Sequence, residues 1–231
     1  MILIFVFASI SFCQNEYYDY SIVTQPFSKY FSPKEYNASA SNWSIAQDKR
    51  GIMYFGNSQG LLEYDGTSWR EIKIPFSAIV RTIAVDDNGK VFITASSDFG
   101  YLEADSIGQL KFISLKKQLD KVRKIDKEFW DVAVNSKGVF FKTPDEIIRW
   151  DGNDFKIWDS VYAFRLYKIG DDIYSRNQEK GLMKIDGDSI NVIPDGDFFE
   201  DTGVFDMLPL LPPSQDHPGQ ILITTNYSGL F

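Results

Sequence analysis

The sequence predicts an all-β protein built from successive four-stranded antiparallel sheets. Short apolar segments separated by turn sequences recur along the chain, and this recurrence carries the prediction. Composition agrees: 16% of the 231 residues are aromatic, 44% are apolar and 16 are glycines, as expected for a globular β-rich chain with many turns. No segment predicts a long amphipathic helix. Residues 115–129 are expected to form a charged connection with a helical turn or two.

The first sheet is predicted within residues 42–76, where the local signals are clearest. Its four expected strands are Ser44–Asp48, Ile52–Gly56, Leu61–Tyr64 and Ser68–Ile74. Asp65-Gly66 separates two of them, and Asp-Gly favours a hairpin because glycine adopts a positive φ without steric cost. Four short antiparallel strands in this order form a meander, which is the unit of a β-propeller blade.

The same pattern returns along the chain at steps of roughly 35 to 50 residues, the range expected of propeller blades. A single such sheet cannot bury both of its faces and needs neighbours of the same kind. The sequence therefore predicts an incomplete β-propeller with about four and a half blades. The predicted blades span residues 42–76, 80–115, 129–160, 163–195 and 204–231, and the last is incomplete.

The residue pattern of the repeat resembles that of a known family. The segment W-S-I-x-Q-D-x-x-G-x-x-Y-F-G-N-x-x-G-L-L-x-Y-D-G-x-x-W, from Trp43 to Trp69, resembles the two-component regulator propeller repeat. The resemblance implies the extracytoplasmic sensor region of a bacterial hybrid histidine kinase or of a triple-tyrosine, helix-turn-helix regulator. In such a parent, further blades, a triple-tyrosine domain, a transmembrane helix and an output domain follow. The chain is thus expected to be an N-terminal fragment.

The N-terminus predicts export. Met1–Phe12 is apolar, too short to span a bilayer, and fits the core of a signal peptide over residues 1–13. Lipid attachment at Cys13 and a buried first strand are the alternatives. Residues 14–41 are expected to be an N-terminal extension, with a candidate ring-closing strand at Ser21–Thr24. The expected location is the periplasm, as the extracytoplasmic part of a membrane-anchored parent.

Five residues align at the start of the first strand of each blade, the strand that lines the central channel of a propeller. We call them the rim residues: Trp43, Arg81, Trp130, Phe164 and Phe205. Four aromatic side chains and one cation can form a surface on which sugar or base rings stack. The alternative is that these side chains pack between blades as ordinary core.

The chain offers no catalytic or metal-binding motif. The single histidine, His217, lies between Asp216 and Pro218 in an expected turn, and neither a G-x-S-x-G elbow nor a phosphate-binding loop is present. Asp195-Gly196-Asp197 is a poor calcium motif. No catalytic residue, metal or cofactor is therefore predicted. The net charge of −8 argues against binding to nucleic acid.

These observations predict a ligand-sensing or ligand-binding region of a transmembrane signalling or transcription-regulating protein, and not an enzyme. The resemblance implies a glycan or another small ligand, a homodimeric full-length protein, and partners in the missing blades and output domain, such as a histidine kinase. Two alternatives stay open because the fold alone does not define function. One is an exported carbohydrate-active propeller enzyme, and the other is a propeller that binds only proteins.

Overall fold

The computed structural model describes residues 28–75, 78–211, 219–226 and 228–231. The chain divides into two compact units, Met1–Phe31 and Ser32–Phe231, and the fold described below is that of the second. The predicted signal peptide, the candidate strand Ser21–Thr24 and His217 lie outside the described residues.

In its described residues, the second unit contains four four-stranded antiparallel sheets and a two-stranded fifth sheet, each built from strands that follow one another in sequence. In chain order the strands are β1 (Asn42–Gln47), β2 (Met53–Asn57), β3 (Gly60–Tyr64), β4 (Trp69–Ile72), β5 (Val80–Val85), β6 (Val91–Ala95), β7 (Phe99–Ala104), β8 (Leu110–Ser114), β9 (Asp131–Asn135), β10 (Gly138–Lys142), β11 (Glu146–Trp150), β12 (Phe155–Asp159), β13 (Ala163–Ile169), β14 (Asp172–Asn177), β15 (Gly181–Asp186), β16 (Ser189–Val192), β17 (Val204–Leu211) and β18 (Gln220–Thr225). Short helices with described bounds accompany them: α1 (Pro33–Tyr36), α2 (Lys116–Leu119) and the 3₁₀ helix η3 (Gly196–Phe199).

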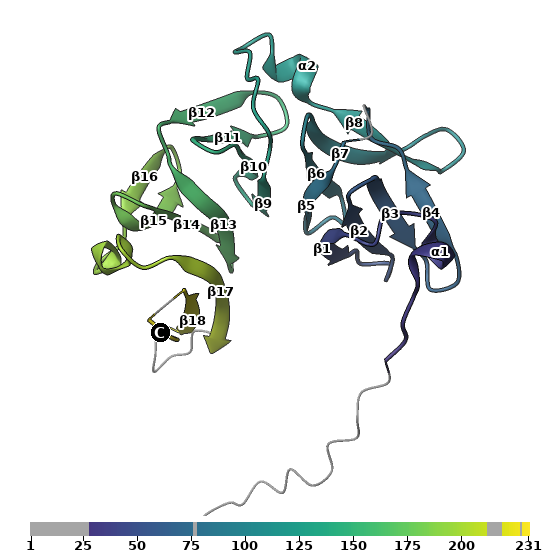
Figure 1. Cartoon of the computed structure of the whole chain (residues 1–231). Coiled ribbons are helices and arrows are strands. Elements are labelled where there is room, and N and C mark those ends of the chain that lie inside the picture. The colour runs from purple at the N-terminus through teal and green to yellow at the C-terminus, as the bar shows by residue number, and fades with distance from the viewer. Residues whose placement is uncertain (1–27, 76–77, 212–218, 227) are drawn as a thin grey trace, which may run out of the picture. The chain divides into compact units, whose positions relative to one another are not determined.

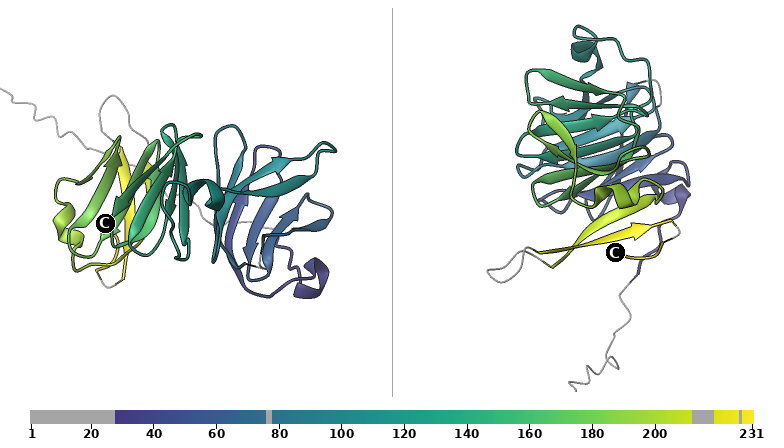
Figure 2. Two further views of the ribbon diagram at one scale, coloured as in Figure 1. Left: turned by 90° about the horizontal axis from the view of Figure 1, so that it is seen from above. Right: turned by 90° about the vertical axis from the view of Figure 1, so that its left-hand side faces the viewer.

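The first strands of successive sheets, β1, β5, β9, β13 and β17, lie next to one another (Figures 1 and 2). The sheets therefore follow one another face to face, in the order of the chain. This is the predicted arrangement of blades. In the first sheet, the four strands begin and end within two residues of the predicted bounds.

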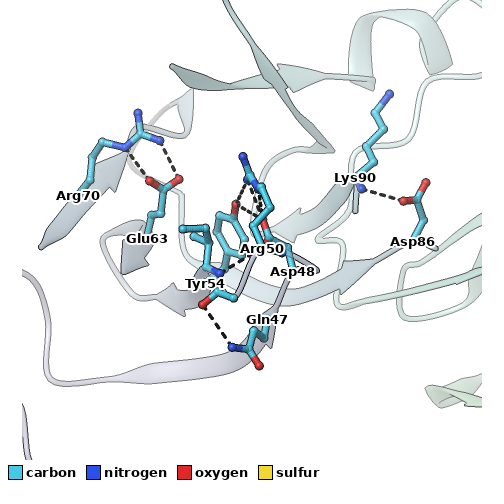
Figure 3. Close-up of polar contacts among 10 residues, drawn as sticks. Gln47, Asp48, Arg50, Tyr54, Glu63, Arg70, Asp86 and Lys90 are labelled. Atoms are coloured by element: carbon cyan, nitrogen blue, oxygen red, sulfur yellow. Dashed lines mark hydrogen bonds and ion pairs between the residues drawn. The ribbon is translucent and has the colours of Figure 1, made fainter. Parts of the chain in front are cut away.

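Repeated turns explain why the strands begin where they do. In the β1–β2 turn, Asp48 Oδ1 accepts hydrogen bonds from the N–H groups of Arg50 and Ile52, and Gly51 has φ +85°. In the β5–β6 turn, Asp86 Oδ1 accepts from Asn88 and Lys90, and Gly89 also has φ +85°. An aspartate that bonds the turn backbone and a glycine with positive φ thus define the same turn twice. Figure 3 shows Asp48 with Arg50 and Asp86 with Lys90.

Asp48 also ties its turn to the sheet beneath it. Its Oδ2 accepts hydrogen bonds from Arg50 Nη2 at 2.7 Å and from the Tyr54 hydroxyl at 3.1 Å (Figure 3). Burial raises the pKa of this carboxyl, but the hydrogen bonds from Arg50, Ile52 and Tyr54 outweigh burial, and the net pKa is lowered. Burial and the Asp48 charge raise the pKa of Tyr54. Asp48 therefore stays ionised and Tyr54 stays neutral near pH 7.

The hydrophobic cores lie between neighbouring sheets, as a repeat of this kind requires. Each core joins one face of a sheet to the facing side of the next. The clusters contain Tyr54, Leu61, Ile83 and Ile93 between the first and second sheets; Phe99, Phe129, Phe141 and Ile148 between the second and third; Phe140, Ile147, Leu166 and Ile173 between the third and fourth; and Tyr167, Leu182, Phe199 and Met207 between the fourth and fifth.

The segment between β8 and β9 contributes to the second of these cores. It forms the predicted helical turn as α2, but it does more than connect two sheets. Leu115, Leu119, Ile125 and Phe129 are buried in the core, and the rings of Phe99 and Phe129 are 4.2 Å apart. Burial of these apolar side chains makes the segment part of the core, whereas the sequence predicts only a charged connection.

Candidate functional site

The five rim residues share one backbone feature. Register shifts in the pairing of the first and second strands leave Trp43, Arg81 and Phe205 as the extra residue in β1, β5 and β17. Such an extra residue defines a β-bulge, which bends the strand and redirects a side chain. In β13 the shift falls between Ala163 and Leu166 and includes Phe164.

Trp130 occupies the corresponding place in the third sheet. It directly precedes β9, and its N–H donates to the Lys142 carbonyl at 2.8 Å, while Asp131 pairs with the same Lys142. Two residues of one strand thus face one residue of the other. The alignment of the rim residues in sequence therefore corresponds to an equivalent position in each sheet.

Three rim residues form a stack across the first three sheets. The Arg81 guanidinium carbon lies 4.8 Å from the ring centroid of Trp43 and 4.4 Å from that of Trp130. A guanidinium held between two indole faces is attracted by both ring quadrupoles. The indoles themselves are 53% and 43% exposed, so an aromatic surface remains accessible to a ligand on this stack.

Hydrogen bonds hold the members of the stack in place. Trp43 Nε1 donates to the Ser58 hydroxyl at 2.9 Å, and the Thr82 hydroxyl donates to the Trp130 carbonyl at 2.8 Å. Arg81 Nη2 contacts Glu128 Oε2 at 3.4 Å. The charge of Arg81 is thus balanced by a carboxylate of the same chain, while its Nε has no acceptor among the described residues.

The other two rim residues line a cavity at the fourth and fifth sheets. Phe164 and Phe205, 59% and 51% exposed, border a cavity of about 200 Å³. The remaining lining residues are Arg176, Gln178, Gly203, Val204 and Asn226. Arg176 is the last residue but one of β14 and is buried. Sequence analysis did not single it out, because an arginine in the segment Ser175–Lys180 gives no sign of burial.

A buried polar pair connects the third and fourth sheets beside these residues. Asp131, next to Trp130, accepts hydrogen bonds from the N–H groups of Val132 and, in β13, of Leu166. Lys142 faces it across the β9–β10 pair and donates to the Thr143 carbonyl. Burial raises the pKa of Asp131 and lowers the pKa of Lys142 to about 8. Asp131 thus bonds the backbone of both β9 and β13, next to Trp130.

A larger cavity, of about 560 Å³, lies at the opposite ends of the second and third sheets' first strands. Its lining includes Lys90, whose ammonium lies 3.5 Å from the Tyr101 ring centroid. Several of its polar side chains are engaged within the protein, since Asp86 bonds its own turn and Lys137 pairs with Asp186. None of the rim residues lines it.

No cluster of three potential metal ligands is found within the described residues. The same part of the chain contains no helix that is both long and apolar enough to cross a membrane. Of the predicted site residues, Trp43, Arg81 and Trp130 come together in one stack, and Phe164 and Phe205 come together at one cavity. Ligand binding by these residues stays a prediction.

Solved structures with a similar fold include virginiamycin B lyase from Staphylococcus aureus, with a TM-score of 0.55, 13% identity, and coverage of 79% of this chain and 62% of that one. They also include the extracellular domains of two proteins described as hybrid two-component systems of B. thetaiotaomicron. For BT3049 the TM-score is 0.53 and the identity 16%, with coverage of 87% of this chain and 30% of that one. For BT4673 the TM-score is 0.50 and the identity 12%, with coverage of 85% of this chain and 26% of that one.

These neighbours are β-propeller proteins, and the predicted fold class is confirmed. Two of them are extracellular domains of hybrid two-component systems. This is the class of signalling protein whose propeller repeat the sequence resembles. The chain spans 62% of the length of the lyase chain and less than a third of the two sensor domains. No protein-family model and no curated protein matches the sequence.

Proposed function

We propose that this chain is the extracytoplasmic ligand-binding propeller region of a bacterial transmembrane signalling or transcription-regulating protein. The observation that carries the proposal is the repeated bulge, which places a half-exposed aromatic ring or a cation at the same point of each sheet. Exposed aromatic rings at equivalent positions stabilise nothing in the inter-sheet cores. They form a surface suited to a ring-containing ligand such as a glycan fragment.

Similar extracellular domains in hybrid two-component systems support this role. In such a protein, ligand binding changes the population of two arrangements of the sensor, and the output domain responds to that change. An exported location, in the periplasm, and a homodimeric parent belong to the same proposal.

The proposed function is tested by titration with di- and trisaccharide fragments of common polysaccharides. Intrinsic tryptophan fluorescence and calorimetry measure the binding. Trp43→Ala and Trp130→Ala are expected to weaken binding by about tenfold or more, since each removes a stacking face. Trp158→Phe is the matched control, because Trp158 stacks on Phe140 in the third sheet and lies outside the rim. Binding that both alanine variants retain at full affinity would contradict the proposal.

An enzymatic role is the second candidate, because virginiamycin B lyase shares the fold. The same oligosaccharides, incubated with the chain and analysed for cleavage products, distinguish the two. We expect binding without cleavage. Cleavage that persists in Trp43→Ala and Trp130→Ala would place the active chemistry away from the rim and favour the enzyme.

A further inference from the structure

Arg176 carries a buried charge that has no counter-ion among the described residues. The residue is only 8% exposed. Its Nε donates to the Phe199 carbonyl at 2.8 Å, and its Nη2 donates to the Glu200 carbonyl. Throughout the described part of the chain, no carboxylate lies within ion-pair distance of it, and Nη1 has no hydrogen-bond acceptor. A buried cation without an anion is costly, although carbonyl dipoles offset part of that cost.

The cavity beside Arg176 is lined by groups that suit an anionic ligand. Its volume is about 200 Å³, which fits a small molecule or one unit of a larger one. Phe164 and Phe205 border it with exposed rings, while Gln178 and Asn226 add amide groups that donate and accept hydrogen bonds. A cation, two apolar rings and two amides therefore line one small space.

We infer that this cavity binds a small carboxylate with a flat apolar face, and that the carboxylate pairs with Arg176. A guanidinium matches a carboxylate in geometry and offers two parallel donors. The two N–H groups bound to carbonyls leave Nη1 and the second hydrogen of Nη2 for such a pair. A single cation favours a monoanion over a phosphate dianion, which would leave one charge unbalanced in a partly buried site.

The contrast with Arg81 supports the assignment. Arg81 is held between two indoles and contacts Glu128. Arg176 has neither an indole stack nor a carboxylate in the described structure. The inference rests on the proposed function only in that Phe164 and Phe205 are rim residues.

The test compares a carboxylate with its neutral counterpart. Calorimetric titration of the full chain uses benzoate against benzamide, and D-glucuronate against D-glucose. At least one carboxylate is expected to bind about tenfold or more tightly than its neutral partner, the difference that a charge-assisted pair provides. Equal affinity for both members of each pair, or no binding of either carboxylate at millimolar concentration, would overturn the inference.

Variants locate the binding. Arg176→Met is expected to abolish the preference for the carboxylate, and Arg176→Lys to weaken it because a lysine lacks the planar fork. Arg149→Met is the control, since Arg149 is also largely buried but already pairs with Asp188. Phe205→Ala changes a half-exposed ring and is expected to leave folding intact, so it tests the cavity even where Arg176→Met fails to fold. Unchanged carboxylate binding in Phe205→Ala and in folded Arg176→Met would contradict the inference.

The oligosaccharide experiment separates this inference from the proposed function. If Trp43→Ala and Trp130→Ala lose oligosaccharide binding but no carboxylate preference is found, only the inference about Arg176 fails. If the carboxylate binds at Arg176 and no oligosaccharide binds the indoles, the anion site stands without the proposed glycan surface.

Discussion

The Trp43–Arg81–Trp130 stack and the Phe164–Phe205 cavity use the same backbone bulge in opposite ways. In the first, the cation itself occupies the rim position and is balanced by aromatic rings and Glu128. In the second, rings occupy the rim positions, and a cation reaches the site from the end of β14 without a balancing carboxylate among the described residues. The same repeated position therefore belongs in one region to a stack that pairs its cation within the chain, and in the other to a cavity whose cation has no carboxylate partner among the described residues.

The largest expected effect is at Asp131, which links these two regions. Asp131→Ala removes the acceptor of the Leu166 N–H and the carboxylate that lies 3.9 Å from Arg165 Nε. It also removes one of the two carboxylates, Asp131 and Asp145, whose charges favour the protonated form of buried Lys142. We expect a loss of about 3–5 kcal/mol in the free energy of unfolding, as for breaking a buried charged pair. Urea denaturation measures it.

The matched control is Asp206→Ala. Asp206 also follows a rim residue and accepts the N–H of the next residue, but it is exposed. Asp206→Ala should lower the free energy of unfolding by about 1 kcal/mol or less. Equal losses for the two variants would show that Asp131 does not hold the two regions together.

The next effect is a pH dependence from Lys142. Burial lowers its folded-state pKa to about 8, against 10.5 in the unfolded chain. Between these values the unfolded state binds more protons, so stability rises with pH. We expect a gain of about 2 kcal/mol between pH 8 and 10, from about 1.4 kcal/mol per unit of pKa difference.

Urea denaturation at several pH values measures this rise, with the range ended at pH 10. Above pH 10, the free energy of unfolding falls again as pH increases, because burial raises the folded-state pKa values of Tyr54 and Tyr167. Lys142→Met should abolish the rise, while the exposed Lys168→Met should preserve it. A rise that survives in Lys142→Met would assign it to other groups.

The smallest effect is expected in the stack. Arg81→Met keeps an apolar stem but removes the cation between two indoles, and it should cost about 1–2 kcal/mol. Arg81→Lys keeps the charge and should cost less. Thermal unfolding measures stability, and tryptophan fluorescence reports on the indoles. If Arg81→Met unfolds at the wild-type temperature with an unchanged spectrum, the stack contributes nothing.

Sequence reasoning located the sheets well because turn chemistry is local. The Asp48 and Asp86 turns, each with a glycine at φ +85°, repeat a pattern that can be recognised from the residues alone. The alignment of repeats also identified the rim residues. It did not predict the bulge, because an extra residue in one strand becomes visible only when the partner strand is known.

The contributions of Arg176 and Asp131 could not be predicted for a different reason. Both are charged residues in strands or next to turns, where charged residues are usually exposed. Their burial arises from contacts with a neighbouring sheet: Arg176 with the carbonyls after η3, and Asp131 with β13. Such contacts join residues 23 and 35 positions apart in sequence, and no local pattern records them.

The bulge also separates two kinds of evolutionary constraint. The four aromatic rim residues are exposed and lie outside the inter-sheet cores, so under the proposed function their exchange alters recognition at little cost to folding. The core positions between sheets must keep their volume, whereas the rim positions can vary one at a time. Under the proposed function, a lineage that carries this scaffold acquires a new ligand through a few substitutions at rim positions, while the sheets beneath them remain the same.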